Sequence, residues 1–182
     1  RVYVRSGRLD YRAWLEGLKA GRTFVTNGPI LEFTLAGRGP GGTIELTAPD
    51  TLMATVSMRS IVAVDSVQIV GRGRVVATVP LAGAGTRADA RVRVPVLESG
   101  WFTLRAFSRE ARHPTLDIYP FATTSPVYVN VGGAPVRSPE DARYFLRWID
   151  QLVPQIEADV ARLTRDYEVT RTQYTALVQR LE

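Results

Sequence analysis

Between Ile30 and Val131 the chain consists of short β-forming runs separated by clusters of glycine, proline and other turn residues. In the run Ala88–Val94, apolar residues occupy every second position, which is typical of a strand with one buried and one hydrated face. Short strands at such regular spacing predict two antiparallel sheets packed face to face. The runs that we expect to form strands are Ile30–Ala36, Thr43–Thr47, Leu52–Arg59, Ser66–Val70, Arg74–Val79, Ala88–Val94, Trp101–Phe107 and Val127–Val131.

The segment before this β-rich region predicts a short amphipathic helix. Asp10 is a suitable N-cap and Gly21 a suitable terminator, and apolar side chains follow the i, i+3, i+4, i+7 pattern at Tyr11, Trp14, Leu15 and Leu18. Because this apolar face needs a partner, we expect the helix to pack against another surface. A strand at Arg22–Thr26 and a turn made by Asn27, Gly28 and Pro29 should follow.

The region after the strands changes to a helical period. Ser138 is suited to cap a helix that begins at Pro139, and Pro154 should kink or break this helix or begin a second one. Mostly apolar residues then recur every seven positions in two series, which are Val153, Val160, Tyr167, Tyr174, Leu181 and Ile156, Leu163, Thr170, Leu177. This pattern predicts either a coiled-coil or helix-hairpin dimer contact, or a long helix that lies on its own domain.

Together these patterns predict a mainly β protein. We expect an antiparallel β-sandwich, immunoglobulin-like or a jelly roll, with a short N-terminal helix and C-terminal α-helices. The expected divisions are a junction helix and strand over residues 1–29, the sandwich over 30–136 and the C-terminal helices over 137–182.

The composition excludes several kinds of chemistry, because the 182 residues include one histidine and no cysteine. Thiolate zinc sites, iron–sulfur clusters, disulfide scaffolds, cysteine nucleophiles and metal centres with two histidines from this chain are all ruled out. The net charge of +5 is dispersed along the chain and not gathered on a stripe, so we expect no nucleic-acid partner. No apolar run is long enough to cross a bilayer, so we expect no membrane partner. The lack of cysteine fits cytoplasmic and secreted proteins alike and leaves the compartment open.

Three short motifs have structural interpretations that we prefer to catalytic ones. Gly37–Gly42 matches the dinucleotide motif G-x-G-x-x-G, but a β-forming run follows it where a helix would be needed, so we expect a connection between strands. Gly71–Arg74 is expected to be a hairpin turn. His113 and Asp117, with hydroxyl side chains nearby, could form a catalytic set, but no nucleophile elbow is present and we expect an exposed loop histidine.

The stretch from Trp14 to Pro29, which reads WLEGLKAGRTFVTNGP, is distinctive as a whole. It resembles the segment that follows the catalytic domain in PHP-type metal-dependent hydrolases of the CehA/McbA group, which includes carbaryl-hydrolase-like proteins. Further stretches resemble the C-terminal region of that group in the same order, namely Val67–Gly71 with Gly73–Val76, Ser99–Ala106, Thr124–Val129 and Ala142–Asp150. The resemblance covers nearly the whole chain up to about Leu152.

The resemblance implies a hydrolase whose PHP domain binds divalent metals through several histidines and acidic residues. This sequence, which begins at Arg1, lacks that domain and looks like a piece of a larger protein. The implied function is a non-catalytic accessory domain with no cofactor of its own, which braces its own N-terminal catalytic domain or assembles the oligomer. By resemblance, the residues at the junction with the catalytic domain are Trp14, Arg22, Thr23, Thr26, Asn27, Gly28 and Pro29.

An alternative function is a carbohydrate-binding or other ligand-binding module, because sandwiches often present aromatic rings on a flat face. The candidate rings are Trp101, Tyr119, Phe121 and Tyr128. Core packing would explain the same residues, since strand alternation must bury either Trp101 or Phe102. Exposure of two or more rings on one face would favour binding, and burial would favour scaffolding.

Overall fold

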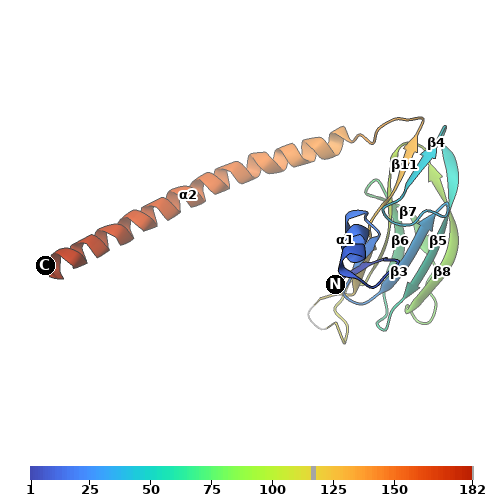
Figure 1. The fold of residues 1–182 in the computed structure, drawn as a ribbon, viewed down its shortest axis with the longest axis horizontal. Coiled ribbons are helices and arrows are strands. Elements are labelled where there is room, and N and C mark those ends of the chain that lie inside the picture. The colour runs from blue at the N-terminus through green and yellow to red at the C-terminus, as the bar shows by residue number, and fades with distance from the viewer. Residues whose placement is uncertain (116–117, 182) are drawn as a thin grey trace. The chain divides into compact units, whose positions relative to one another are not determined.

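The computed structural model describes residues 1–115 and 118–181 of the chain. The chain divides into two compact units, Arg1–Val136 and Arg137–Glu182. The first unit holds the strands and the short helix α1 (Tyr11–Lys19), and the second is built around the long helix α2 (Pro139–Leu181) (Figure 1). Each unit is considered by itself below.

The first unit is a β-sandwich, which confirms the predicted fold class. One sheet has the strand order β3-β5-β8, and these strands are Ile30–Leu35, Asp50–Arg59 and Arg87–Val96. The larger sheet contains β1 (Val2–Val4), β2 (Thr23–Thr26), β4 (Thr43–Leu46), β6 (Ser66–Gly71), β7 (Arg74–Val79), β9 (Gly100–Phe107), β10 (Phe121–Thr124) and β11 (Val127–Val131).

The strand order distinguishes between the two predicted kinds of sandwich. Strands β3, β5 and β8 correspond to A, B and E of an immunoglobulin-like fold, and β6, β9 and β11 correspond to C, F and G in the facing sheet. The chain leaves the first sheet after β3 and crosses to the second, where β4 pairs in parallel with β11. We therefore describe the unit as an immunoglobulin-like sandwich.

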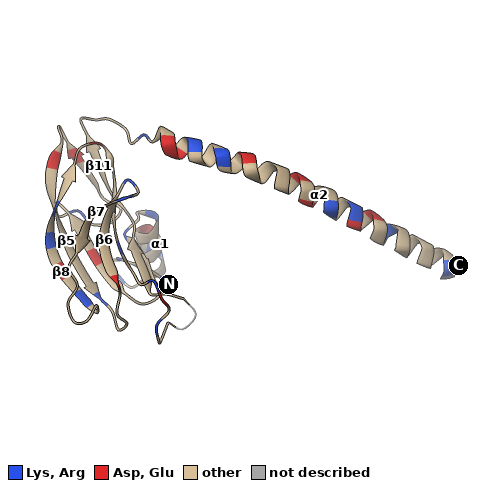
Figure 2. Cartoon of the chain, turned by 180° about the vertical axis from the view of Figure 1, so that it is seen from behind, with Lys and Arg blue, Asp and Glu red and all other residues tan. Residues whose placement is uncertain are grey.

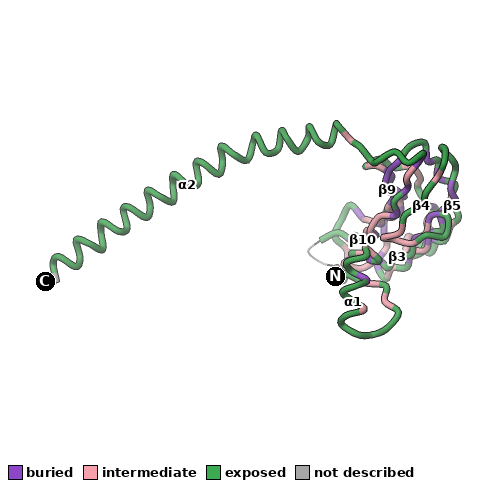
Figure 3. The backbone as a smooth tube through the Cα atoms, turned by 45° about the horizontal axis from the view of Figure 1, so that its top comes forward, coloured by how far each residue is buried: buried purple, intermediate pink, exposed green. Residues whose placement is uncertain are grey.

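The hydrophobic core lies between the two sheets and follows the predicted alternation. In β9 every second residue is buried, and Phe102, Leu104 and Ala106 point into the core. All fully buried apolar members of the core cluster lie between Leu31 and Val131 (Figure 3). β8 runs through Pro95 to Val96, two residues beyond the predicted end, because β8 is an edge strand where the missing N–H of proline costs no ladder bond.

The last strand of the sandwich is split into β10 and β11 at Ser125 and Pro126. Both halves pair with the same edge of β9, with a register shift of one residue between them. On their other edge the halves have different partners, since β10 pairs with β2 and β11 pairs with β4. The split therefore lets the N-terminal segment and the β4 strand share one edge of the sheet.

The N-terminal segment belongs to the same unit as the sandwich. Helix α1 begins after the predicted cap, since the Ala13 N–H donates to Asp10 Oδ1 at 2.9 Å, and the chain leaves it through Gly21 at φ +68°. β1 and β10 were not predicted. They have three and four residues, too few to establish a period of two.

The second unit corrects the prediction of more than one C-terminal helix. α2 is a single helix of 43 residues that continues through Pro154. Proline removes one backbone N–H donor from the helix ladder, and the helix nevertheless extends on both sides of Pro154. The predicted start is confirmed, because the Asp141 N–H donates to Ser138 Oγ at 3.2 Å.

Candidate functional site

Six of the predicted junction residues lie where the N-terminal segment joins the sandwich. Thr23 and Thr26 are buried in β2, and the Thr23 hydroxyl is 2.6 Å from the Ser125 hydroxyl at the split between β10 and β11. Thr26 Oγ1 accepts a bond of 2.8 Å from the Gly28 N–H, which tightens the turn. Sequence reasoning missed Ser125, whose role depends on a contact across 102 residues.

Asn27 fastens this turn to the start of β10. Its side-chain Nδ2 donates to the Tyr119 carbonyl at 2.8 Å, and its Oδ1 accepts from the Phe121 N–H at 2.7 Å. The Asn27 backbone N–H adds a third bond, to the Phe121 carbonyl at 3.1 Å. Asn27 thus extends the pairing of β2 with β10 beyond the last ladder residue.

The remaining junction residues differ in exposure. Pro29 is fully buried and Gly28 is half-buried, whereas Arg22 is exposed, with its Nε at 3.4 Å from the Arg5 carbonyl oxygen. Trp14, on α1, keeps 38% of its surface exposed. Trp14 and Arg22 are therefore the two of the seven whose side chains face solvent.

Helix α1 contacts the sheet through a face different from its apolar face. Its buried residue is Gly17, and a Cβ added there would collide with the Val4 side chain of β1. At roughly 100° per residue, the apolar residues lie roughly 60° to 160° from Gly17 around the helix, and the centre of their face lies roughly a third of a turn away. They remain between 38% and 75% exposed, and they are Tyr11, Trp14, Leu15 and Leu18.

The candidate aromatic face divides into two clusters on the outer side of the larger sheet. Trp101 and Tyr128 are cross-strand partners, and Tyr128 is 43% exposed. Phe121 and Tyr119 form the other cluster, with an edge-to-face contact of 6.3 Å between ring centroids. Because Phe121 is opposite Phe107, six residues along β9 from Trp101, the clusters are roughly 20 Å apart.

Between the two clusters the outer face is polar and paired. The Arg105 guanidinium donates to Gln68 Oε1 at 2.7 and 3.0 Å and lies 5.3 Å from the centre of the Phe107 ring. Of the pair Trp101 and Phe102, Phe102 is the ring that packs in the core. Core packing therefore does not account for the candidate rings that remain exposed, which are Tyr119, Phe121 and Tyr128.

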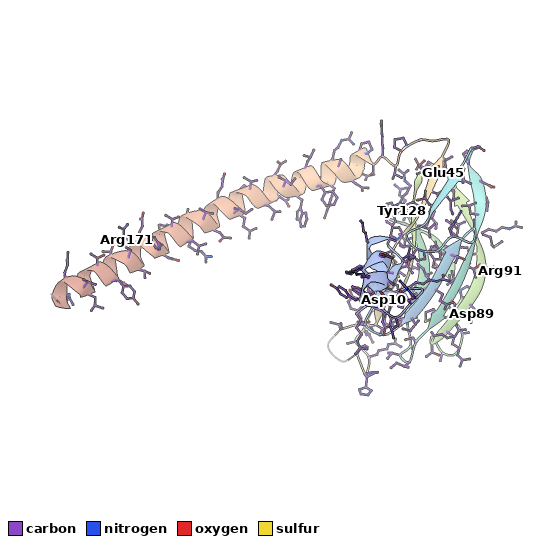
Figure 4. The ribbon with its side chains drawn as sticks, in the orientation of Figure 1. Asp10, Glu45, Asp89, Arg91, Tyr128 and Arg171 are labelled. Carbon is purple, nitrogen blue, oxygen red and sulfur yellow. The ribbon has the colours of Figure 1, made fainter. Side chains whose placement is uncertain are left out.

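The outer face of the three-stranded sheet is hydrophilic by comparison. Asp89 and Arg91 of β8 lie there, as Figure 4 shows, on the opposite sheet from Tyr128. Arg59 binds both oxygens of the Asp89 carboxylate, at 2.9 and 3.0 Å. The Arg59 hydrogen bond, followed by that of Ser57, holds the pKa of the Asp89 carboxyl below its usual value of 3.8.

An open groove of about 810 Å³ borders the junction. It runs between the β1–β2 ribbon, the strand β3 and the glycine-rich turn, and stacked rings of Tyr3 and Phe24, 5.0 Å apart, lie along it. Its charged lining is mostly basic and comprises Arg5, Arg22, Arg38 and Glu32.

The structure bears out the structural interpretation of the three short motifs. Gly37–Gly42 connects β3 to β4, with no helix after it, and Gly71–Arg74 forms the turn between β6 and β7. His113 is exposed, and Asp117, its predicted acidic neighbour, lies outside the described residues.

The acidic residues among the strands are separated and bound to different partners. Glu45 accepts from Asn130 Nδ2 at 2.7 Å, and Asp65 pairs with Arg112 at 2.8 Å. Within residues 1–115 and 118–181, no group of three or more histidine, cysteine or acidic side chains is placed to hold a metal ion. Basic and acidic residues are interspersed along α2 and over the sandwich (Figure 2).

Comparisons with protein-family models, with curated proteins and with solved structures give no match for this chain. Over the described residues, no helix is both long and apolar enough to span a membrane.

Proposed function

We propose that the chain is a non-catalytic accessory domain of a PHP-type metal-dependent hydrolase and braces the catalytic domain of that protein. The observation that carries this proposal is the orientation of α1, which contacts β1 at Gly17 while its apolar side chains remain 38–75% exposed. An amphipathic helix held in this way offers a ready contact surface to a neighbouring folded domain.

The position of this surface suits a neighbour that precedes the sandwich in the chain. α1 is flanked by β1 and β2, which pair with each other, and β2 is fixed to β10 by Asn27 and by the contact between Thr23 and Ser125. The apolar face is therefore carried on a ribbon that is anchored to the core at its C-terminal side. A domain docked on that face would be held rigidly against the sandwich.

The test uses the protein expressed from its complete reading frame. Leu18→Ser and Trp14→Ser on the apolar face should lower the thermal midpoint of the catalytic domain by about 3–8 °C, because each removes a buried apolar side chain at the contact. Arg12→Ser, on the polar face of the same helix, is the matched control and should leave that midpoint unchanged.

Two results would overturn the proposal. One is a complete reading frame without a histidine-rich metal-binding domain before Arg1. The other is hydrolysis of ester or carbamate substrates by the purified 182-residue chain, loaded with zinc or manganese, above a control without protein.

A second candidate function, the binding of a carbohydrate or similar ligand, is favoured by the exposure of Tyr119, Phe121 and Tyr128. Each cluster is small and the two are separated, so a binding site would use one of them. Titration with cellohexaose, followed by calorimetry, should give heat that Phe121→Ala or Tyr128→Ala abolishes. Absence of binding by the unaltered chain would exclude this oligosaccharide as a ligand.

A further inference from the structure

The helix α2 carries an apolar stripe with no cover from its own unit. Every residue from Pro139 to Arg180 is exposed, as Figure 3 shows along the whole helix. The two seven-residue series extend back from Val153 and Ile156 to Leu146 and Ile149, and we call the whole stripe the α2 seam. Its apolar members with described side chains are 46–67% exposed and comprise Leu146, Ile149, Val153, Ile156, Val160, Leu163, Tyr167, Tyr174 and Leu177.

Burying the α2 seam against a second helix would supply the stability that a single helix lacks. Helix propagation alone is marginal in water, and α2 contains a proline and several β-branched residues of low helix propensity. At roughly 80 Å² per apolar seam side chain, two copies would bury about 1,400 Å². That value lies within the size of stable, specific interfaces, about 1,200–2,000 Å².

We propose that α2 pairs with α2 of a second copy of this chain in a parallel, in-register, two-stranded coiled coil. In this arrangement the a positions include Val153 and Val160 and the d positions include Leu163 and Leu177, a combination that favours two strands. Leu146 at a with Ile149 at d is the combination found in higher oligomers, so the preference for two strands comes from the later heptads. The polar d residue Thr170 brings no unsatisfied group, because its hydroxyl donates to the Asp166 carbonyl of its own helix at 2.8 Å. The hydroxyl groups of the tyrosines at a can reach water at the edge of the interface.

The flanking charges favour the parallel arrangement. Asp166 at a g position lies opposite Arg171 of the second copy at the following e position, which gives two attractive pairs per dimer. No like charges meet at the other g and e positions in register.

Antiparallel arrangements fit less well. In an antiparallel pair, g positions face g positions of the second copy, and Asp159 and Asp166 are both g residues. One of the two registers that cover most of the α2 seam places Asp166 opposite Asp166 of the copy. The other, shifted by one heptad toward the N-terminus, places Asp166 opposite Asp159 of the copy. A shift toward the C-terminus avoids this repulsion but leaves Leu146, Ile149 and Val153 uncovered.

The inference deepens the assembly role that the resemblance implies. Only this assembly role rests on the proposed function, because the pairing itself is argued from α2. If the unaltered chain is a monomer in solution, the proposed dimer is wrong and the bracing role of α1 is unaffected. If the α1 variants leave the thermal midpoint of the catalytic domain unchanged, the bracing role is wrong and the dimer is unaffected.

The absence of cysteine from the chain allows a direct test of orientation. A parallel, in-register dimer brings Leu177 next to Leu177 of the second copy. In each of the antiparallel registers considered above, the two Leu177 residues are roughly 25 Å or more apart. A disulfide needs Cα atoms within about 7 Å of each other. Leu177→Cys in the full chain should therefore form a disulfide-linked dimer under mild oxidation. Gln179→Cys, on the opposite face of α2, is the matched control and should stay monomeric on a non-reducing gel.

Sedimentation equilibrium of the cysteine-free chain gives an independent readout. The full chain should sediment as a dimer, and Leu163→Glu should shift it to a monomer with at least a tenfold weaker association. Ala158→Glu, away from the α2 seam, should leave the dimer intact. A monomeric unaltered chain, equal cross-linking of both cysteine variants, or a dimer in which Leu177→Cys does not cross-link would overturn the proposal.

Discussion

Gly41 lies where three distant parts of the chain approach one another. Its N–H donates to the Pro126 carbonyl at 2.8 Å, beside the split between β10 and β11, and its backbone adopts φ +81°. A Cβ at this position would collide with the carbonyl oxygen of Ala20, at the end of α1. The glycine that resembles part of a nucleotide-binding motif in sequence is thus required by a close backbone approach.

Gly41→Ala should destabilise the sandwich by about 2–4 kcal/mol, because it adds a steric clash to a strained backbone angle. The matched control is Gly37→Ala in the same turn. Gly37 has φ +76° but no heavy atom within 4 Å of an added Cβ, so only about 1–2 kcal/mol should be lost. Urea unfolding of both variants measures the two free energies. If both variants lose the same free energy of unfolding, the backbone around Ala20 can move away from the added Cβ without an energetic cost.

At the scale of elements, residue alternation predicted the strands that are long enough to display it. The predicted ends of β7 and β11 agree with the structure, and those of the other predicted strands differ by one or two residues. Alternation alone did not reveal the short strands β1 and β10, whereas β2 and β4, which have four residues each, were predicted with the help of the glycine-containing turns beside them. Pro154 was misleading, because a proline inside a long helix can remove one hydrogen bond without ending the helix.

Pro154→Ala should raise the thermal midpoint of α2, because proline inside a helix costs about 3 kcal/mol relative to alanine. Pro154 lies one residue after Val153 and outside the α2 seam, so the substitution leaves the proposed interface unchanged. Circular dichroism at fixed protein concentration follows the helix, and Gln155→Ala serves as a near-neutral control. A lower midpoint for Pro154→Ala would mean that the interface requires a bend at this point.

At the scale of the whole molecule, the two units have separate sources of stability. Among the described residues, the core cluster of the sandwich contains none from α2, and α2 has its apolar stripe outside that core. The boundary between the two units, after Val136, lies near the change of period in the sequence. A helical or strand period shows which face of an element is apolar, but it does not identify the partner that covers the exposed apolar faces of α1 and α2.

A chain of residues 1–136 should fold and unfold with a thermal midpoint within about 2 °C of that of the full chain, measured at the same low concentration by the near-ultraviolet signal of the sandwich. The same chain should sediment as a monomer. A loss of cooperative unfolding in this shortened chain would contradict the independence of the sandwich.

The candidate site was predictable as a group of residues but not in its geometry. The stretch Arg22–Pro29 was singled out, yet which of its side chains are buried depends on β10, an element that alternation did not reveal. The same limit applied to the aromatic rings. Alternation required that Trp101 or Phe102 be buried, and the register with β11 and β6 decides that it is Phe102.

The strand pairing also determines how the sandwich bears tension. The Arg1 backbone nitrogen donates to the Thr26 carbonyl, next to the start of β10, whereas Val131 ends β11 at the other end of the same sheet. A pull applied at Arg1 and Val131 therefore acts along the strands, and the ladder bonds, which lie across them, must shear together. The sandwich is thus arranged as a stiff mechanical link between its N-terminal strand and the segment that leads to α2.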